Sequence, residues 1–189
     1  MEQGQSHKDL TAVNQISCWV KTVIVEHNFC PFAKRELERE SIRYSVDHST
    51  DLESALQVVI DEFVYLDNND ATETTLLIFV DGFKDFADYL DLVGLGQELL
   101  ADQGYEGIYQ LASFHPDYCF ADAEQDDAAN YTNRSPYPML HLIREASMAQ
   151  ALKLYPEPEK IPERNVEYAR ELGLEEMQRQ LQACCKTDK

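Results

Sequence analysis

Residues 74–80, TTLLIFV, form the most hydrophobic run of the chain and constrain its fold most strongly. The run is short, rich in β-branched residues and followed by the turn residues Asp81 and Gly82. Such a run is typical of a strand that is buried on both faces. It therefore predicts the central strand of a sheet.

Strands and helices alternate along the first two thirds of the chain. Spacing of apolar residues predicts strands at 42–46, 74–80 and 107–112, and helices at 9–27, 31–40, from 52 to the acidic turn at 67–70, and 84–101. This alternation favours parallel strands joined by right-handed crossovers. We therefore predict an α/β fold, a small three- to four-stranded, mainly parallel sheet with packed helices. Residues 117–121 are the expected fourth strand.

Helices are expected in the remaining part of the chain. Ser135 suits an N-cap and Pro136 suits the first helical position, so a helix is predicted from there to about Leu152. A further helix begins at Pro162 and ends at a glycine, and a last one follows to about residue 185. A chain of 189 residues fits one domain. Within it, residues 156–189 are expected to form a C-terminal helical extension and residues 1–8 to be disordered.

The composition is strongly acidic, with 35 Asp and Glu against 16 Lys and Arg and a net charge of -19. This charge repels phosphate backbones and anionic membranes, so we expect no nucleic-acid and no membrane partner. No stretch approaches the ~20 apolar residues of a membrane helix, and no signal peptide is recognisable. The five cysteines are odd in number and irregularly spaced, which indicates reduced thiols in a cytoplasmic protein.

Residues 113–144 concentrate the side chains that can do chemistry. The stretch holds His115, Cys119 and His141, several aspartates and two arginines. Ligands of open α/β sheets bind beyond the carboxyl ends of the strands, and the order of elements places His115 there. We therefore predict a catalytic role for His115. The alternative is a histidine that hydrogen-bonds loop backbone.

The predicted helix start at Ser135 suggests a site for a small anion. Free backbone N–H groups and the helix dipole attract negative charge there, and Arg134 adds a planar fork of donors. His141 and Arg144 are three residues apart and would share one face of this helix. With Asn130, these residues form the predicted substrate-binding set, in which His141 transfers protons. The alternative is that the arginines pair with some of the many acidic residues.

Cys30 is the candidate nucleophile. It precedes Pro31 at a predicted helix start and stands near Lys34 and Arg35, a setting that lowers the pKa of a thiol. Lys34 is also one of the predicted substrate-binding residues. The alternatives are a buried structural cysteine or, because a Cys-Pro pair can ligate iron through its thiolate, a haem ligand.

A metal site is the weaker possibility. His115, Asp117 and Asp126 offer nitrogen and oxygen ligands, but no spacing matches a defined metal site. We therefore predict no metal site, keep these three residues as weak candidates, and assign no cofactor.

Several longer motifs carry a family resemblance. They are NFCPFAKRE at 28–36, GYEGIYQLASFHPDYCF at 104–120, NYTNRSPYPMLHLIRE at 130–145 and IPERN at 161–165. Together they resemble an uncharacterised bacterial family known only as a domain of unknown function, over nearly the whole chain. The resemblance implies no activity. It implies that the stretches selected on chemical grounds are those by which the family is recognised.

The leading hypothesis is a cytosolic enzyme that acts on a small anionic substrate. Arg134 and Arg144 would hold the anion, His115 or His141 would transfer protons, and Cys30 would be the nucleophile. One alternative is a non-catalytic module that binds haem or a metal. Another is a protein-interaction domain whose residues 113–144 contact a partner.

Overall fold

The computed structural model describes residues 6–153 and 155–186, and its centre is a four-stranded mixed sheet. The strands are β1 (Ile42–Asp47), β2 (Thr74–Phe79), β3 (Tyr109–Phe114) and β4 (Met139–Arg144), in the order β1-β2-β4-β3. The α/β class is confirmed. The expected mainly parallel sheet is too loose a description, because among the described strands β1 and β2 are the one parallel pair.

The first three strands nevertheless run in the same direction, as the sequence predicted. β4 runs antiparallel to both β2 and β3, so β1, β2 and β3 share one direction. Their carboxyl ends therefore lie at one edge of the sheet.

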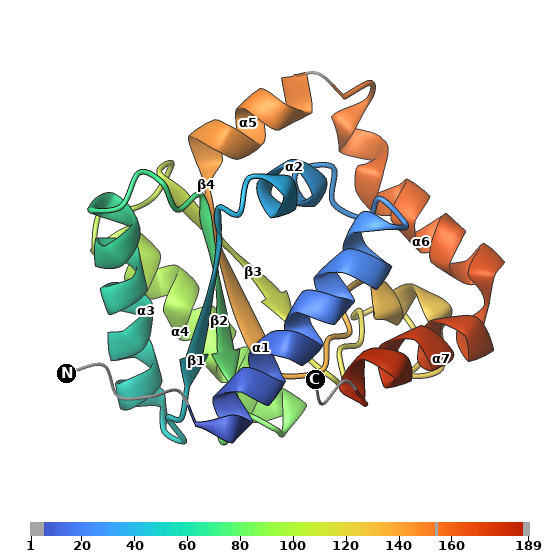
Figure 1. Cartoon of the computed structure of the whole chain (residues 1–189), viewed down its shortest axis with the longest axis horizontal. Helices are drawn as coiled ribbons and strands as arrows, with labels where there is room; N and C mark the ends of the chain where they lie inside the picture. The colour runs from blue at the N-terminus through green and yellow to red at the C-terminus, as the bar shows by residue number, and fades with distance from the viewer. Residues whose placement is uncertain (1–5, 154, 187–189) are drawn as a thin grey trace.

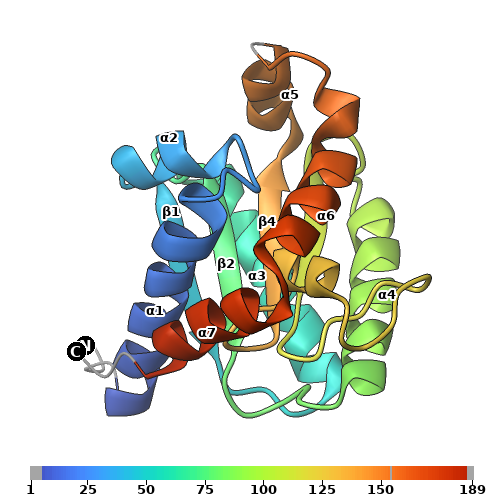
Figure 2. The same ribbon diagram turned by 90° about the vertical axis from the view of Figure 1, so that its right-hand side faces the viewer.

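Helices cover both faces of the sheet, so the molecule has three layers (Figure 1). The helical elements are α1 (His7–Trp19), the π-helix η1 (Val20–Val25), α2 (Ala33–Glu38), α3 (Leu52–Asp67), α4 (Phe86–Asp102), the 3-10 helices η2 (Ala128–Thr132) and η3 (Pro158–Lys160), α5 (Glu145–Lys153), α6 (Ile161–Leu172) and α7 (Leu174–Cys185). α3 and α4 cover one face. α1, α6 and α7 lie on the other, as the turned view in Figure 2 shows.

α3 begins at the predicted residue, for reasons that its sequence makes plain. Its N-cap Asp51 accepts a hydrogen bond from the backbone N–H of Ser54 at 2.9 Å. One face of the helix then carries apolar residues at helical spacing, all fully buried: Ala55, Val59, Phe63 and Leu66. They pack against Leu77 and Phe79 of β2, which alternate toward this side of the sheet.

The helix predicted from Ser135 to Leu152 is wrong. Residues 139–144 form β4, and α5 follows only from Glu145 to Lys153. The apolar run of β4 is buried on both faces of the sheet, and such a short run fits helix and strand patterns equally. Pro136 and Pro138 were the better signal, because a proline forces the residue before it into extended conformation.

The fourth strand predicted at 117–121 is also wrong, because this segment is a loop. The backbone of this loop hydrogen-bonds to the side chain of the fully buried Asn130 and not to a neighbouring strand. Its Oδ1 accepts from the backbone N–H of Phe120 at 3.0 Å, and its Nδ2 donates to the carbonyl of Glu124 at 2.8 Å. The loop backbone is thus satisfied by η2 instead of by the sheet.

The first two helices begin at slightly different residues from those predicted. Residues 1–5 of the predicted disordered segment lie outside the described residues, while Ser6 forms a capping box with Asp9 and α1 starts at His7. α2 begins at Ala33 instead of residue 31, so Cys30 is not its N-cap. The predicted helix 9–27 is α1 continued by η1.

Gly82 marks the closest approach of two turns at the carboxyl edge, and its replacement by alanine is expected to destabilise the fold. A Cβ atom there would overlap the carbonyl oxygen of Ser49 and lie 3.0 Å from the Cα of Thr50. We expect Gly82→Ala to lower the free energy of unfolding by about 2 kcal/mol in urea titrations, because backbone atoms must move. Gly94→Ala, inside α4 with open space around it, should raise it by about 0.5–1 kcal/mol. Equal effects of the two substitutions would contradict the close approach.

Candidate functional site

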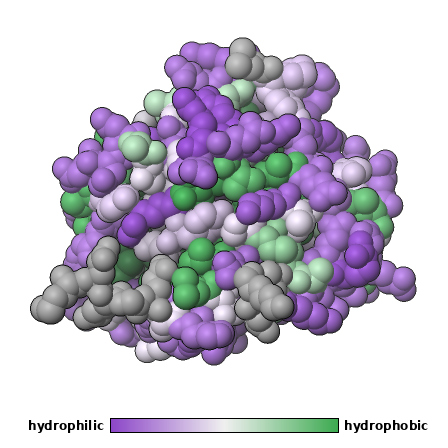
Figure 3. Space-filling model, in the orientation of Figure 1, coloured by the Kyte–Doolittle hydropathy of each residue, from purple (hydrophilic) through white to green (hydrophobic). Residues whose placement is uncertain are grey.

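A pocket of about 480 Å³ lies on the face of the sheet that carries α1. β2, β3 and β4 form its floor, and η1, residues 29–33, α2 and the segment from α5 to α6 form its walls. The lining is mostly apolar. Its polar members include Trp19, Cys30, Glu36, Thr74, His141 and Asn165. On the side of the molecule that faces the viewer in Figure 3, where α1 and α2 lie, hydrophobic residues gather near the centre.

Two of the sequence motifs build adjacent walls of this pocket. Asn165 of the IPERN motif donates from Nδ2 to the carbonyl of Phe29 at 2.6 Å, and Arg164 donates to the carbonyl of Asn28. Asn28 has a positive φ of 54°, which asparagine tolerates better than most residues. These contacts fix the loop that presents Cys30, which also lines the pocket.

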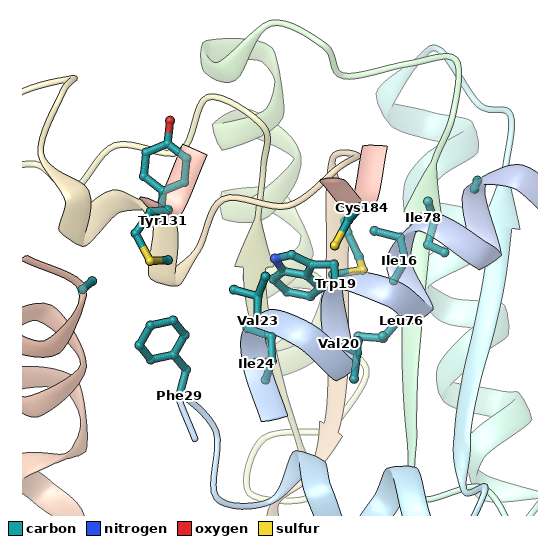
Figure 4. Close-up of a cluster of buried hydrophobic side chains, with 14 of the residues drawn as sticks. Ile16, Trp19, Val20, Val23, Ile24, Phe29, Leu76, Ile78, Tyr131 and Cys184 are labelled. Carbon is teal, nitrogen blue, oxygen red and sulfur yellow. The ribbon is translucent and has the colours of Figure 1, made fainter. Parts of the chain in front are cut away.

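The pocket is also bordered by η1, where α1 widens into a π-helical turn. Val20 and Ile24 of this turn line the pocket, and π turns occur frequently at functional sites. Trp19, the last residue of α1, lies among these side chains in Figure 4. Its indole Nε1 is buried and has no hydrogen-bond partner among the described residues. This donor without a partner belongs to a side chain that lines the pocket.

His141 lies on β4 and lines the pocket floor. The hydroxyl of Thr74 donates to the carbonyl of Leu142 at 2.5 Å, so its single proton is used there. The contact of 2.7 Å between His141 Nε2 and Thr74 Oγ1 is therefore donated by the imidazole. Nδ1 is then an unprotonated acceptor, and within the described part of the chain it has no partner. Burial lowers the pKa of His141 to about 4, so the ring is neutral at physiological pH.

Cys30 lines the same pocket as His141, and its electrostatic setting differs from the prediction. Burial raises the pKa of its thiol, and the N–H groups of Phe32 and Ala33 offset this only in part. Lys34 points into solvent, with 71% of its side chain exposed, at 4.0 Å from a glutamate of its own helix. The predicted lowering of the Cys30 pKa is wrong, because burial of the sulfur outweighs the N–H groups at the start of α2 and Lys34 does not face the sulfur.

Glu36 brings a carboxylate to the pocket lining although it is fully buried. Its Oε2 accepts from the hydroxyl of Ser41 at 2.7 Å. Its Oε1 lies 3.1 Å from Nε of Arg35, an ion pair without hydrogen-bond geometry. Sequence analysis selected neither Glu36 nor Trp19. Trp19 is also part of the hydrophobic core, as expected of a large apolar side chain, and no local pattern separates the buried Glu36 from its exposed neighbours.

Arg134, Ser135 and Asn130, predicted to bind the anion, instead bind protein backbone: Arg134 and Asn130 hold the loop 115–134 together, and Ser135 bonds within the turn before β4. Arg134 donates from Nε to the carbonyl of Tyr118 and from Nη2 to that of Gln125, both at 2.9 Å. Ser135 is buried and donates to the carbonyl of residue 137 at 2.6 Å. None of the three lines the pocket.

Arg144 lies on the opposite face of the sheet from the pocket. Its guanidinium donates to the carbonyls of Leu66 at 2.5 Å and Thr72 at 3.3 Å, and to the hydroxyl of Tyr109 at 3.0 Å. Arg144 and Arg134 therefore do not converge on a common ligand. Each satisfies backbone carbonyls of its own neighbourhood.

His115 stands at the predicted sheet edge but has no free nitrogen. It is fully buried, donates from Nε2 to the carbonyl of Phe83 at 3.0 Å, and accepts at Nδ1 from the N–H of Asp117 at 3.0 Å. Burial lowers the pKa of His115. Phe83 has a positive φ of 57°, so His115 fixes a strained turn. The structure matches the loop-histidine alternative.

The rest of the carboxyl edge is occupied by groups that pair with one another. His48 contacts Asp81 through Nδ1 at 2.6 Å and Asp9 through Nε2 at 3.0 Å, and Lys8 also pairs with Asp81. The hydrogen bond to Asp81 raises the pKa of His48, while Lys8 and His48 lower the pKa of Asp81 to about 2. This cluster ties the start of α1 to the sheet.

The weak metal candidates do not assemble with further ligands. Asp117 and Asp126 are exposed, and the ring nitrogens of His115 are both engaged. Among residues 6–153 and 155–186, no group of three or more His, Cys, Asp or Glu side chains is arranged to hold a metal ion.

Comparison with known proteins gives a family and no activity. A family model described as "Protein of unknown function (DUF1415)" matches residues 11–179. No curated protein and no solved structure matches the chain. Within the described residues, every helix is too short or too polar to cross a membrane.

Proposed function

We propose that this chain, which belongs to the DUF1415 family, binds a small, uncharged and largely apolar molecule in the pocket lined by Cys30 and His141. One observation carries the proposal. A mostly apolar pocket of about 480 Å³ is lined by Trp19, whose buried indole N–H has no partner among the described residues, and by His141, whose Nδ1 is a free acceptor. Pockets with a few polar groups in an apolar lining are typical small-molecule sites.

The charges around the pocket favour an uncharged ligand over the small anion expected from the sequence. No lysine or arginine is among the described residues that line it. His141 is neutral, and Arg35 is paired with Glu36. An anion would enter without a cationic partner, which is costly in a buried site. The haem alternative meets the same objection, because the haem propionates are anions.

The free polar atoms suggest what the ligand carries. Trp19 Nε1 offers a proton, so it favours a ligand with an oxygen acceptor. His141 Nδ1 offers a lone pair, so it favours a ligand with an O–H or N–H donor. Leaving such buried groups unpaired costs about 1–3 kcal/mol each, which a matching ligand would recover. An aromatic or aliphatic alcohol or a primary or secondary amide has this combination.

The same geometry supports binding more strongly than catalysis. An attack by Cys30 requires a thiolate, and burial raises the pKa of this thiol. His141, with a pKa of about 4, is a weak base for removing the proton. We therefore assign Cys30 the role of a ligand contact. The five free thiols and the net charge of -19 support a cytoplasmic protein without a nucleic-acid partner.

The proposal predicts selective binding of a neutral dye. 1-Aminoanthracene is uncharged, apolar and carries an N–H donor, whereas 1-anilinonaphthalene-8-sulfonate is an anion. We expect saturable fluorescence enhancement of 1-aminoanthracene at one dye per chain and at least about tenfold weaker binding of the sulfonate, because the pocket lacks cations.

Two substitutions to phenylalanine separate the pocket from the rest of the surface. Ala112 of β3 lines the pocket floor beside its register partner His141, so Ala112→Phe should fill the pocket and abolish binding of 1-aminoanthracene. Ala87 is exposed on α4, on the other side of the sheet, so Ala87→Phe should leave binding unchanged. Ala33→Phe tests the α2 wall if Ala112→Phe fails to fold. Binding that is equal in all variants, or preference for the sulfonate, would overturn the proposal.

A further inference from the structure

Two cysteines that are far apart in the sequence meet between the N-terminal and C-terminal helices. Cys18 Sγ of α1 lies 3.1 Å from Cys184 Sγ of α7. Both are free thiols, Cys18 half-buried and Cys184 buried. The hydroxyl of Thr22 lies 3.3 Å from Cys184 Sγ. Disulfide sulfurs are separated by about 2.0 Å, so closing the pair requires a movement of about 1 Å.

We propose that Cys18 and Cys184 are an oxidisable dithiol, a modification site that a small-molecule disulfide such as oxidised glutathione converts into an intramolecular disulfide. The inference is independent of the proposed ligand, because it rests only on the contact between α1 and α7. Among the described residues, Cys30 and Cys119 have no second sulfur at hydrogen-bond distance. Cys185 follows Cys184 and is exposed, and the short sulfur–sulfur contact of Cys18 is made to Cys184.

The chemistry proceeds by two thiol–disulfide exchanges. The thiolate of Cys18, the more accessible sulfur, attacks one sulfur of oxidised glutathione, forms a mixed disulfide and releases one glutathione thiolate. The thiolate of Cys184 then attacks the Cys18 sulfur and releases the second glutathione. The two cysteines lose two protons and two electrons in total, and the small disulfide is reduced to two glutathione molecules. Burial raises the pKa of Cys184, so Cys18 is the sulfur that attacks first, and the second exchange is intramolecular.

The cross-link would fasten two helices next to the pocket. Figure 4 shows Cys184 beside Trp19, which follows Cys18 in α1 and lines the pocket. A disulfide here would enclose most of the chain and restrict the unfolded state. In a reducing compartment such a bond forms transiently, under oxidative conditions.

The test uses the full chain carrying Cys185→Ser, so that one cysteine remains in the C-terminal peptide. The protein is incubated with oxidised glutathione, blocked with N-ethylmaleimide and mapped by mass spectrometry. We expect a cross-linked peptide pair joining Cys18 and Cys184, with the loss of two hydrogens from the intact protein and alkylation of Cys30 and Cys119. The midpoint of thermal unfolding should rise by roughly 5 °C or more.

Matched variants keep the inference falsifiable. With Cys184→Ser, we expect a glutathione adduct that persists on Cys18 and no thermal shift. With Cys18→Ser, we expect at least about tenfold slower modification of Cys184, because the accessible sulfur is gone. Persistent glutathione on Cys18 while Cys184 is intact, or a cross-link to another cysteine, would overturn the inference.

Discussion

Replacing Arg144 with methionine is expected to lower the free energy of unfolding by about 3–5 kcal/mol. The guanidinium satisfies the carbonyls of Leu66 and Thr72 and the hydroxyl of Tyr109, and methionine offers no donor to any of them. Because these acceptors connect α3, β3 and the turn before β2, several elements lose a partner at once. Urea unfolding followed by circular dichroism measures the change.

Two controls separate a structural Arg144 from a ligand-binding one. Arg179→Met removes an exposed arginine, 68% accessible, that pairs with a glutamate of its own helix, and it should change stability by less than about 0.5 kcal/mol. Arg144 faces away from the pocket, so folded Arg144→Met protein should bind 1-aminoanthracene with unchanged affinity. Lost dye binding with unchanged stability would show that Arg144 belongs to the site after all.

The second large effect is a loss of stability in mild acid caused by His141. Burial lowers its folded pKa to about 4, whereas an unfolded histidine titrates near 6.5. Between these values the unfolded state binds more protons, so stability falls as the pH falls from about 6.5 to about 4. The full difference corresponds to about 3 kcal/mol. His115, whose pKa burial also lowers, adds a loss of the same sign.

Comparison with His141→Gln isolates the contribution of this residue. Glutamine keeps a side-chain N–H donor for Thr74 but does not titrate. We expect the difference in unfolding free energy between variant and wild type to change between about pH 6.5 and about pH 4.5, and to be constant above about pH 6.5. His48 does not interfere, because its pKa is raised and its contribution is complete below about 6.5. Parallel curves would mean that His141 is charged or solvated in the folded protein.

The strand and helix pattern before residue 115 was largely readable from the sequence. The run at 74–80 became β2 because a short β-branched segment between polar turns has few alternatives. α3 followed from Asp51 as a cap and one apolar face. β4 was not readable in the same way, since its run fits helix and strand, and its place between β2 and β3 is decided by tertiary packing.

The error at β4 also explains the error in the predicted site. In a helix, His141 and Arg144 would share a face, but in a strand residues three apart point to opposite faces. His141 therefore lines the pocket, while Arg144 reaches the α3 side of the sheet. The presence of Cys30 and His141 in one pocket depends on how β4 and the loop at 28–32 pack, which no local pattern encodes.

The most direct test of the pocket uses the indole N–H of Trp19. The chain has one tryptophan, so one indole resonance reports on the pocket in a ¹⁵N NMR spectrum. Titration with 2-naphthalenemethanol, a neutral alcohol, is compared with 2-naphthoate, an anion of similar shape. The account predicts that the alcohol shifts this resonance saturably, through a hydrogen bond to the unpartnered Nε1, and that the carboxylate shifts it much less. A resonance that the alcohol leaves unmoved, or that both compounds move equally, would contradict it.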